Sequence, residues 1–127
     1  MDFPDGLKFT KEHEWLRETD NKKAFIGITD FAQAELGDIV YVNLPEAGDK
    51  LTAGEPLGDV ESVKAVSGVH SPVTAVVKAI NEELLDNPAL INTAPYDAWL
   101  VEVENITGYV DLMDTQTYRQ FCEQKKG

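Results

Sequence analysis

The sequence predicts a mostly β fold, a flattened sandwich of two antiparallel sheets with short helices and a C-terminal helix. Short apolar runs are separated at close intervals by Gly, Pro, Asn and Asp, which argues against a parallel α/β fold. Two Val-rich segments, 39–49 and 73–86, each run into a turn with acidic residues, as two similar halves of a sandwich would. The length fits one domain, 1–127.

The first part of the chain predicts strands followed by a short helix. A strand pair is expected within 7–19, and a buried strand over 24–28, where the apolar run is continuous. A helix over 31–36 follows, because Thr29 offers an N-cap and Gly37 stands where a C′ glycine ends a helix.

The middle of the chain predicts further strands. The segment 38–44 alternates, so its odd-numbered and even-numbered residues should face opposite sides of a sheet. A Val-rich run over 73–80 predicts another strand, and 99–103 alternates again. Between them, Asn81 is expected to cap a helical turn that ends at Leu85.

The last element expected is a helix with one buried stripe. Asp114 provides the N-cap, and Tyr118, Phe121 and Cys122 follow at the i, i+3, i+4 spacing of an apolar helix face. Because Cys122 is the only cysteine, the chain forms no internal disulfide, and a reducing compartment is expected.

Composition and charge limit the classes of partner. The net charge is -12, from 23 acidic and 11 basic side chains, so phosphate backbones and anionic lipid are repelled, and neither nucleic acid nor a membrane is expected as a partner. This charge serves solubility or steers the chain toward basic docking faces. No secretory signal or long apolar segment is evident, so we expect a cytoplasmic protein, or a mitochondrial one already trimmed.

Motifs for nucleotide binding and hydrolysis are missing from the sequence. Neither glycine-rich phosphate loop occurs, nor the G-x-S-x-G elbow. His13 and His70 are far apart in the chain, and only Cys122 could join them around a metal ion. We therefore expect no catalytic residue and no metal site.

One lysine is set apart by its surroundings. Val60 and Val66 flank a tight reversal with Lys64 near its tip, and such a tip holds a side chain in solvent on a rigid backbone. This geometry suits a lysine that an enzyme acylates, although an ordinary surface lysine fits the pattern as well.

The segment Glu61-Ser62-Val63-Lys64-Ala65 resembles the lipoylation motif of glycine cleavage H proteins. Biotin carriers and the lipoyl domains of 2-oxoacid dehydrogenases have other residues before the lysine, where this chain has Val63. The resemblance extends over nearly the whole chain, through His13-Glu14-Trp15, Ile26-Gly27-Ile28-Thr29-Asp30, Val42-Asn43-Leu44-Pro45, Ser71-Pro72-Val73 and Leu90-Ile91-Asn92.

The resemblance implies a lipoyl-domain-like barrel-sandwich hybrid that acts as a carrier and not as an enzyme. Lys64 would carry lipoic acid as an amide, and Glu61 would be recognised by the modifying enzyme, a lipoate ligase or an octanoyl transferase, with Ser62, Val63 and Ala65 completing the motif. The implied partners are glycine decarboxylase (P protein), aminomethyltransferase (T protein) and dihydrolipoyl dehydrogenase (L protein), and we expect the chain to be monomeric.

The resemblance also implies a cleft that shelters the loaded arm, and we expect His13, Glu14, Glu35 and Gly68 to line it. Glu14 would accept the charge of the bound amine. Two of these residues depart from the family, since Gly68 stands where an acidic residue is common and Glu35 where some members have His.

Two other functions use the same residues. The chain could serve another lipoate-dependent pathway, either as a 2-oxoacid dehydrogenase arm or as a relay that passes lipoate on. It could also be an unmodified interaction domain that kept the fold.

Overall fold

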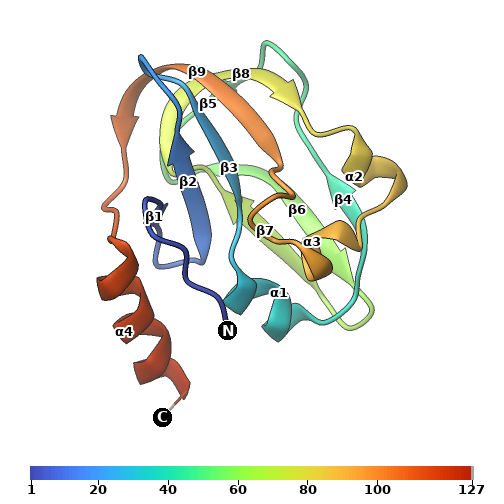
Figure 1. Cartoon of the computed structure of the whole chain (residues 1–127). Helices are drawn as coiled ribbons and strands as arrows, with labels where there is room; N and C mark the ends of the chain where they lie inside the picture. Colours follow the sequence, from blue (N-terminus) through green and yellow to red (C-terminus); the bar gives the residue numbers. More distant parts are fainter. Residues whose placement is uncertain (127) are drawn as a thin grey trace.

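The computed structural model describes residues 1–126, and side chains through residue 124, as two antiparallel sheets with four helices (Figure 1). The larger sheet has the strand order β1-β2-β3-β9-β8-β5, and the smaller has the order β4-β6-β7. The sheets are not closed into a barrel, and the predicted sandwich is confirmed. The strands are β1 Lys8–Phe9, β2 Glu14–Glu18, β3 Ala24–Ile28, β4 Ile39–Asn43, β5 Lys50–Leu51, β6 Pro56–Ser62, β7 Val66–His70, β8 Val73–Ile80 and β9 Val101–Tyr109. The helices are α1 Asp30–Leu36, α2 Glu83–Asp86, α3 Leu90–Thr93 and α4 Thr115–Lys126.

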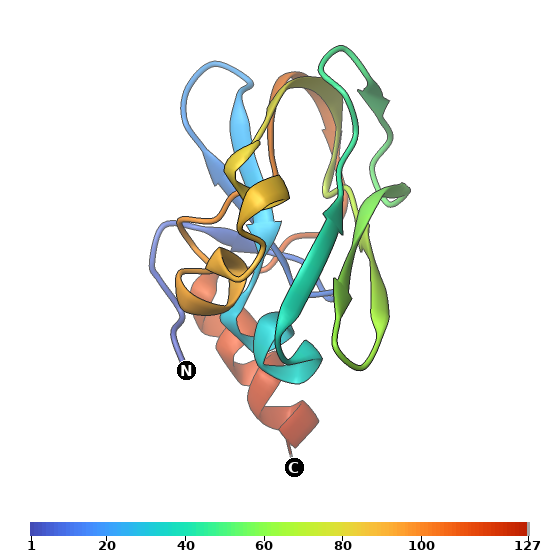
Figure 2. The ribbon, with the colours of Figure 1, turned by 90° about the vertical axis from the view of Figure 1, so that its right-hand side faces the viewer.

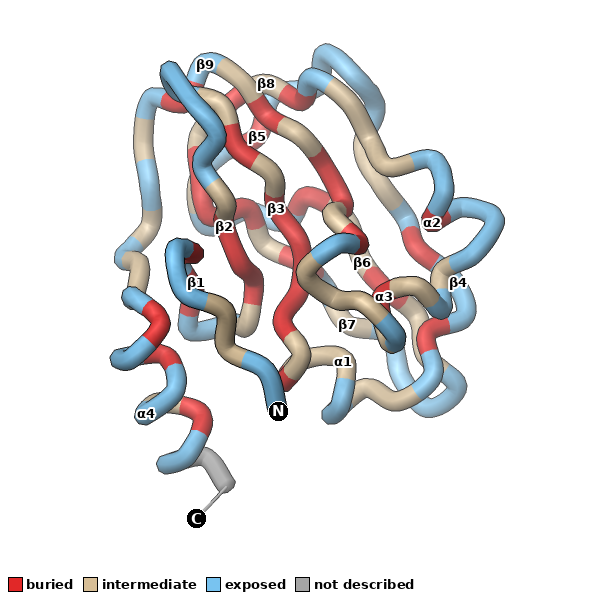
Figure 3. The backbone as a smooth tube through the Cα atoms, in the orientation of Figure 1, coloured by how far each residue is buried: buried red, intermediate tan, exposed pale blue. Residues whose placement is uncertain are grey.

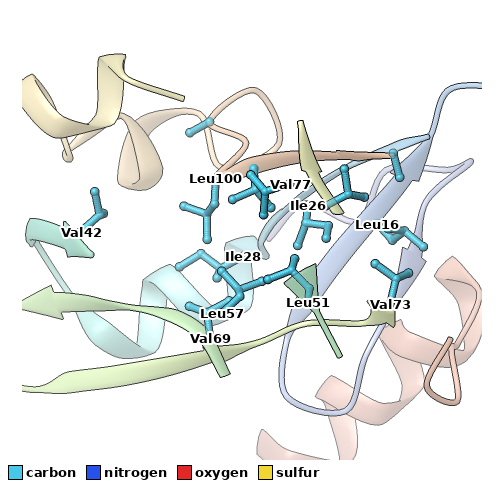
Figure 4. Close-up of a cluster of buried hydrophobic side chains, with 14 of the residues drawn as sticks. Leu16, Ile26, Ile28, Val42, Leu51, Leu57, Val69, Val73, Val77 and Leu100 are labelled. Carbon is cyan, nitrogen blue, oxygen red and sulfur yellow. The ribbon is translucent and has the colours of Figure 1, made fainter. Parts of the chain in front are cut away.

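The main core lies between the two sheets, where aliphatic side chains from both inner faces meet (Figure 4). Buried and more exposed positions alternate along much of the strands (Figure 3), as expected for sheets with one face in the core. Burying one Val, Leu or Ile side chain stabilises the fold by about 1.5–3 kcal/mol. The labelled core residues are Leu16, Ile26, Ile28, Val42, Leu51, Leu57, Val69, Val73, Val77 and Leu100.

A second apolar cluster joins α4 to the strands at the N-terminus. Tyr118 is fully buried and stacks on Phe9 of β1, with ring centroids 4.4 Å apart. Asp114 caps the helix, because its Oδ1 accepts a hydrogen bond from the amide of Thr117 at 2.8 Å. The predicted cap and buried stripe are therefore confirmed for Tyr118 and Cys122, while Phe121 is half-buried.

The expected alternation along β4 is wrong. Ile39 and Val42 are buried, but Val40 and Tyr41 between them are both exposed. The register with β6 shifts between Ile39 and Tyr41, so the strand contains a β-bulge. A bulge inserts one extra residue and breaks the two-residue period, which the sequence pattern alone does not reveal.

Two other boundaries also differ from the prediction. The N-cap of α2 is Glu82, without a side-chain hydrogen bond, and Asn81 contributes only its carbonyl oxygen to the amide of Leu84. The strand expected at 99–103 is β9, which starts at Val101 and continues to Tyr109. In the part of the chain that the structure describes, no helix has the length and apolar character needed to cross a membrane.

Candidate functional site

Lys64 lies in the turn that joins β6 to β7, at the end of the hairpin (Figure 2). Ser62 closes this turn, since its amide donates to the carbonyl of Ala65 at 2.8 Å. The Ser62 hydroxyl oxygen also accepts hydrogen bonds from the amides of Lys64 and Ala65, at 3.2 and 3.1 Å. A serine that satisfies two turn amides holds the backbone of the lysine in one conformation.

The turn is exposed but braced by the neighbouring strand. Val63 is 70% exposed, and Lys64 and Ala65 are exposed as well. The amide of Val63 donates to the carbonyl of Asp38 at 3.0 Å, which ties the turn to the segment before β4. A side chain at this position is open to a large enzyme while its backbone is fixed.

Glu61 occupies the central strand of the small sheet. It lies opposite Tyr41 of β4 and Val66 of β7, and paired residues of antiparallel strands face the same side. Tyr41 is 51% exposed and Val66 is 65% exposed. The Glu61 carboxylate therefore lies between two exposed apolar side chains, three residues before the lysine.

The end of α1 approaches Lys64. A Cβ atom built on Gly37 would lie 3.9 Å from Cε of Lys64, so the lysine stem passes the C-cap of the helix. Asn92 of α3 fixes this end of α1, because its Nδ2 donates to the carbonyl of Gly37 and to Oε1 of Gln33, both at 2.9 Å. Its Oδ1 accepts from the amide of Ile39 at 2.8 Å. Asn92 belongs to one of the segments that carry the sequence resemblance, Leu90-Ile91-Asn92, but the sequence alone assigned no role to it.

A pocket of about 230 Å³ lies at the other end of β7. Its walls come from the β1–β2 turn, the end of β7 and the segment after β9, and its lining includes Thr10, Glu12, Glu14, His70, Ser71 and Val110. The pocket begins four residues along β7 from Val66, which corresponds to about 13 Å of strand.

Glu14 is the buried acid of this pocket, with 2% of its surface exposed. Oε1 accepts a hydrogen bond from the hydroxyl of Thr10 at 2.5 Å, and Oε2 accepts from the amide of His70 at 3.2 Å. Burial raises the pKa of the Glu14 carboxyl, and both hydrogen bonds oppose the rise by favouring the charged form. A buried carboxylate with remaining space beside it can hold a cation.

Glu12 and His70 stand beside Glu14. Oε2 of Glu12 lies 2.7 Å from Nδ1 of His70, and the side chains are 58% and 33% exposed. From the sequence, His70 was considered only together with His13 and Cys122 as a possible metal ligand, and Glu12 was not named. The contact joins a turn and a strand of different sheets, so no local signal in the sequence could have revealed it.

The other residues expected in the cleft lie in different surroundings. The ring of His13 stacks on Phe31 at 4.6 Å and its Nδ1 lies 2.8 Å from the hydroxyl of Tyr118, so His13 is part of the aromatic cluster. Glu35 is exposed on α1. Gly68 is close to His70, since a Cβ atom built on it would lie 3.8 Å from Cε1 of that ring.

Comparisons with known proteins agree on one family. A sequence profile of the family described as Glycine cleavage H-protein matches residues 7–125. The glycine cleavage system H protein of Lachnoclostridium phytofermentans is 48% identical over 121 residues, which cover 95% of each chain. That of Brevibacillus brevis is 50% identical over 127 residues, which cover 98% of this chain and all of the relative.

A solved structure extends the agreement to three dimensions. The crystal structure of a glycine cleavage system H protein from Mycobacterium marinum matches with a TM-score of 0.87 at 35% identity. The match covers 98% of this chain and 99% of the other.

Proposed function

Because the chain belongs to the glycine cleavage H-protein family, we propose that it carries an aminomethyl group from glycine decarboxylase (P protein) to aminomethyltransferase (T protein). Lipoic acid, attached to Lys64 as an amide, supplies the disulfide that is reduced in this transfer and restored by dihydrolipoyl dehydrogenase (L protein). The observation that carries the proposal is the exposed Lys64 on a turn held by Ser62. The chain itself supplies the attachment point and no catalysis.

The surroundings of Lys64 support covalent modification. Its amine is exposed, while the hydrogen bonds of Ser62 and the brace from Asp38 fix the backbone beneath it. A modifying enzyme, either a lipoate ligase or an octanoyl transferase, then meets the same geometry in every encounter. We propose that Glu61 orients this enzyme by pairing with a basic side chain on it.

We further propose that Glu14 holds the positive charge of the loaded amine. Its carboxylate is buried, and a charge interaction in such a site is stronger than in water. The walls of the pocket would also cover one side of a bound group that hydrolyses readily. His13 has a structural part in this scheme, since it contacts Phe31 and Tyr118 and does not line the pocket.

Intact-mass and peptide analysis of protein from its native host test the attachment. One lipoyl group is expected on Lys64, and none in Lys64→Arg, which should fold normally because the side chain is exposed. In an assay reconstituted with the P, T and L proteins, Lys64→Arg should abolish glycine cleavage. A bare Lys64 in native protein, or full activity of Lys64→Arg, would contradict the proposal.

A separate measurement tests Glu14. The rate at which the loaded carrier releases formaldehyde should rise in Glu14→Gln, with Glu35→Gln as a matched exposed control. Equal release rates in wild type and Glu14→Gln would remove Glu14 from the scheme while leaving the role of Lys64 intact.

A further inference from the structure

The corner of the pocket formed by Glu12, Glu14 and His70 has the composition of a metal site. Each residue offers one ligand atom, and these atoms all lie within 4.8 Å of one another. Among the described residues, this is the group of three potential ligands that the fold brings together. It differs from the set of His13, His70 and Cys122 that the sequence alone suggested for consideration.

The Nδ1 atom of His70 gives independent support for a bound cation. This atom is enclosed by protein and makes no hydrogen bond, although Oε2 of Glu12 is only 2.7 Å away. The proton or lone pair of an imidazole nitrogen lies in the ring plane, so an oxygen can be near Nδ1 without being aligned with it. Nδ1 therefore has a charged neighbour but no aligned hydrogen bond, and a cation held between Nδ1 and the Glu12 carboxylate would satisfy both atoms.

We propose that Glu12, Glu14 and His70 bind one divalent transition-metal ion of the Zn²⁺ class. Zn²⁺ accepts both imidazole nitrogen and carboxylate oxygen as ligands, and a site with three protein ligands leaves a fourth position for water or another ligand. Here that position would open into the pocket. Mg²⁺ and Ca²⁺ prefer oxygen ligands alone, so the imidazole favours the transition metal.

The three residues differ in burial in a way that suits binding. Glu14 is buried and held by Thr10 and by the amide of His70, so it is positioned before the ion arrives. Glu12 is exposed and can move by the small amount needed to bring its oxygen to a bond of about 2.0–2.2 Å with the ion. Lys11 and Asp111 also line the pocket and offset each other in charge, which leaves the two glutamates to attract a cation.

The unlipoylated chain tests this inference separately from the proposed carrier function, because a metal ion and the loaded amine would compete for the Glu14 carboxylate. Zn²⁺ is titrated at neutral pH against a chromophoric chelator, and Co²⁺ is used as a spectroscopic substitute. One site per chain is expected, with a visible Co²⁺ absorption typical of low coordination number. His70→Asn and Glu12→Gln should each weaken Zn²⁺ binding by about tenfold or more, while Glu35→Gln, an exposed acid on α1, should not.

The competing explanation is non-specific attraction to an acidic surface. If wild type, His70→Asn and Glu12→Gln bind Zn²⁺ equally, or if Ca²⁺ binds as tightly as Zn²⁺, the site does not exist. Thermal unfolding without metal checks that each variant is folded. Glu12→Gln changes a largely exposed side chain, so it keeps the test decisive even if His70→Asn is unstable.

Discussion

Replacing Asn92 with alanine should loosen the end of α1 that borders Lys64. The side chain makes three hydrogen bonds of 2.8–2.9 Å, to the amide of Ile39, the carbonyl of Gly37 and Oε1 of Gln33. Each contributes about 1 kcal/mol net, and part of this is recovered by water because Asn92 is half-buried. We expect Asn92→Ala to lower the free energy of unfolding by about 2–3 kcal/mol.

Urea unfolding followed by tryptophan fluorescence measures this loss, and the midpoint should fall with little change in slope. Asn92→Asp keeps the oxygen that accepts from the amide of Ile39 but loses the N–H groups that donate to Gly37 and Gln33. An aspartate oxygen would then face the carbonyl of Gly37 and Oε1 of Gln33, so this variant should also lose free energy of unfolding. The neighbouring Thr93→Ala is the matched control, because Thr93 is exposed and its contact to Leu90 is 3.5 Å long. If Asn92→Ala is no less stable than Thr93→Ala, the bracing role is wrong.

Three further outcomes are expected. Gly27→Ala should destabilise the chain by about 2–4 kcal/mol in urea unfolding, since its Cβ atom would lie 2.5 Å from the fully buried ring of Trp15, whereas Gly68→Ala meets no close atom and should cost little. Burial raises the pKa of the Glu14 carboxyl, so the native chain keeps the carboxyl proton to higher pH than the unfolded chain. The contribution of Glu14 to stability is therefore present below the unfolded pKa, and it is lost as the pH rises through the folded pKa. Unfolding of Glu14→Gln and wild type across that range should therefore show the variant gaining relative stability toward neutral pH; an unchanged difference would count against an ionised, buried Glu14. Ser62→Ala removes the acceptor for two turn amides and should slow lipoylation several-fold in a ligase assay, without a comparable loss of global stability.

The parts of the fold that the sequence could predict depend on local patterns. The cap at Asp114, the helix start at Thr29 and the hairpin around Lys64 each follow from residues close together in the chain, and the structure has all three. The bulge in β4 was not predictable, because it arises from the register between β4 and β6. The residue types at Val40 and Tyr41 do not indicate that both side chains face solvent.

The candidate site was predictable to different extents at its two ends. Lys64 and the residues around it form one continuous motif, so the sequence was sufficient to nominate them. Glu12 and His70 meet only because the β1–β2 turn of one sheet packs against the end of β7 in the other. Such contacts between distant segments are set by tertiary packing and carry no spacing rule.

The bulge in β4 also has a consequence for how copies of the chain behave in a concentrated solution. β4 forms one border of the three-stranded sheet and displays Val40 and Tyr41 side by side in solvent. A straight, apolar border strand would be a template for strand addition and aggregation. The bulge interrupts the regular row of amides and carbonyls along β4. This border can therefore expose apolar side chains for contact with an enzyme while disfavouring self-association through β-strand pairing.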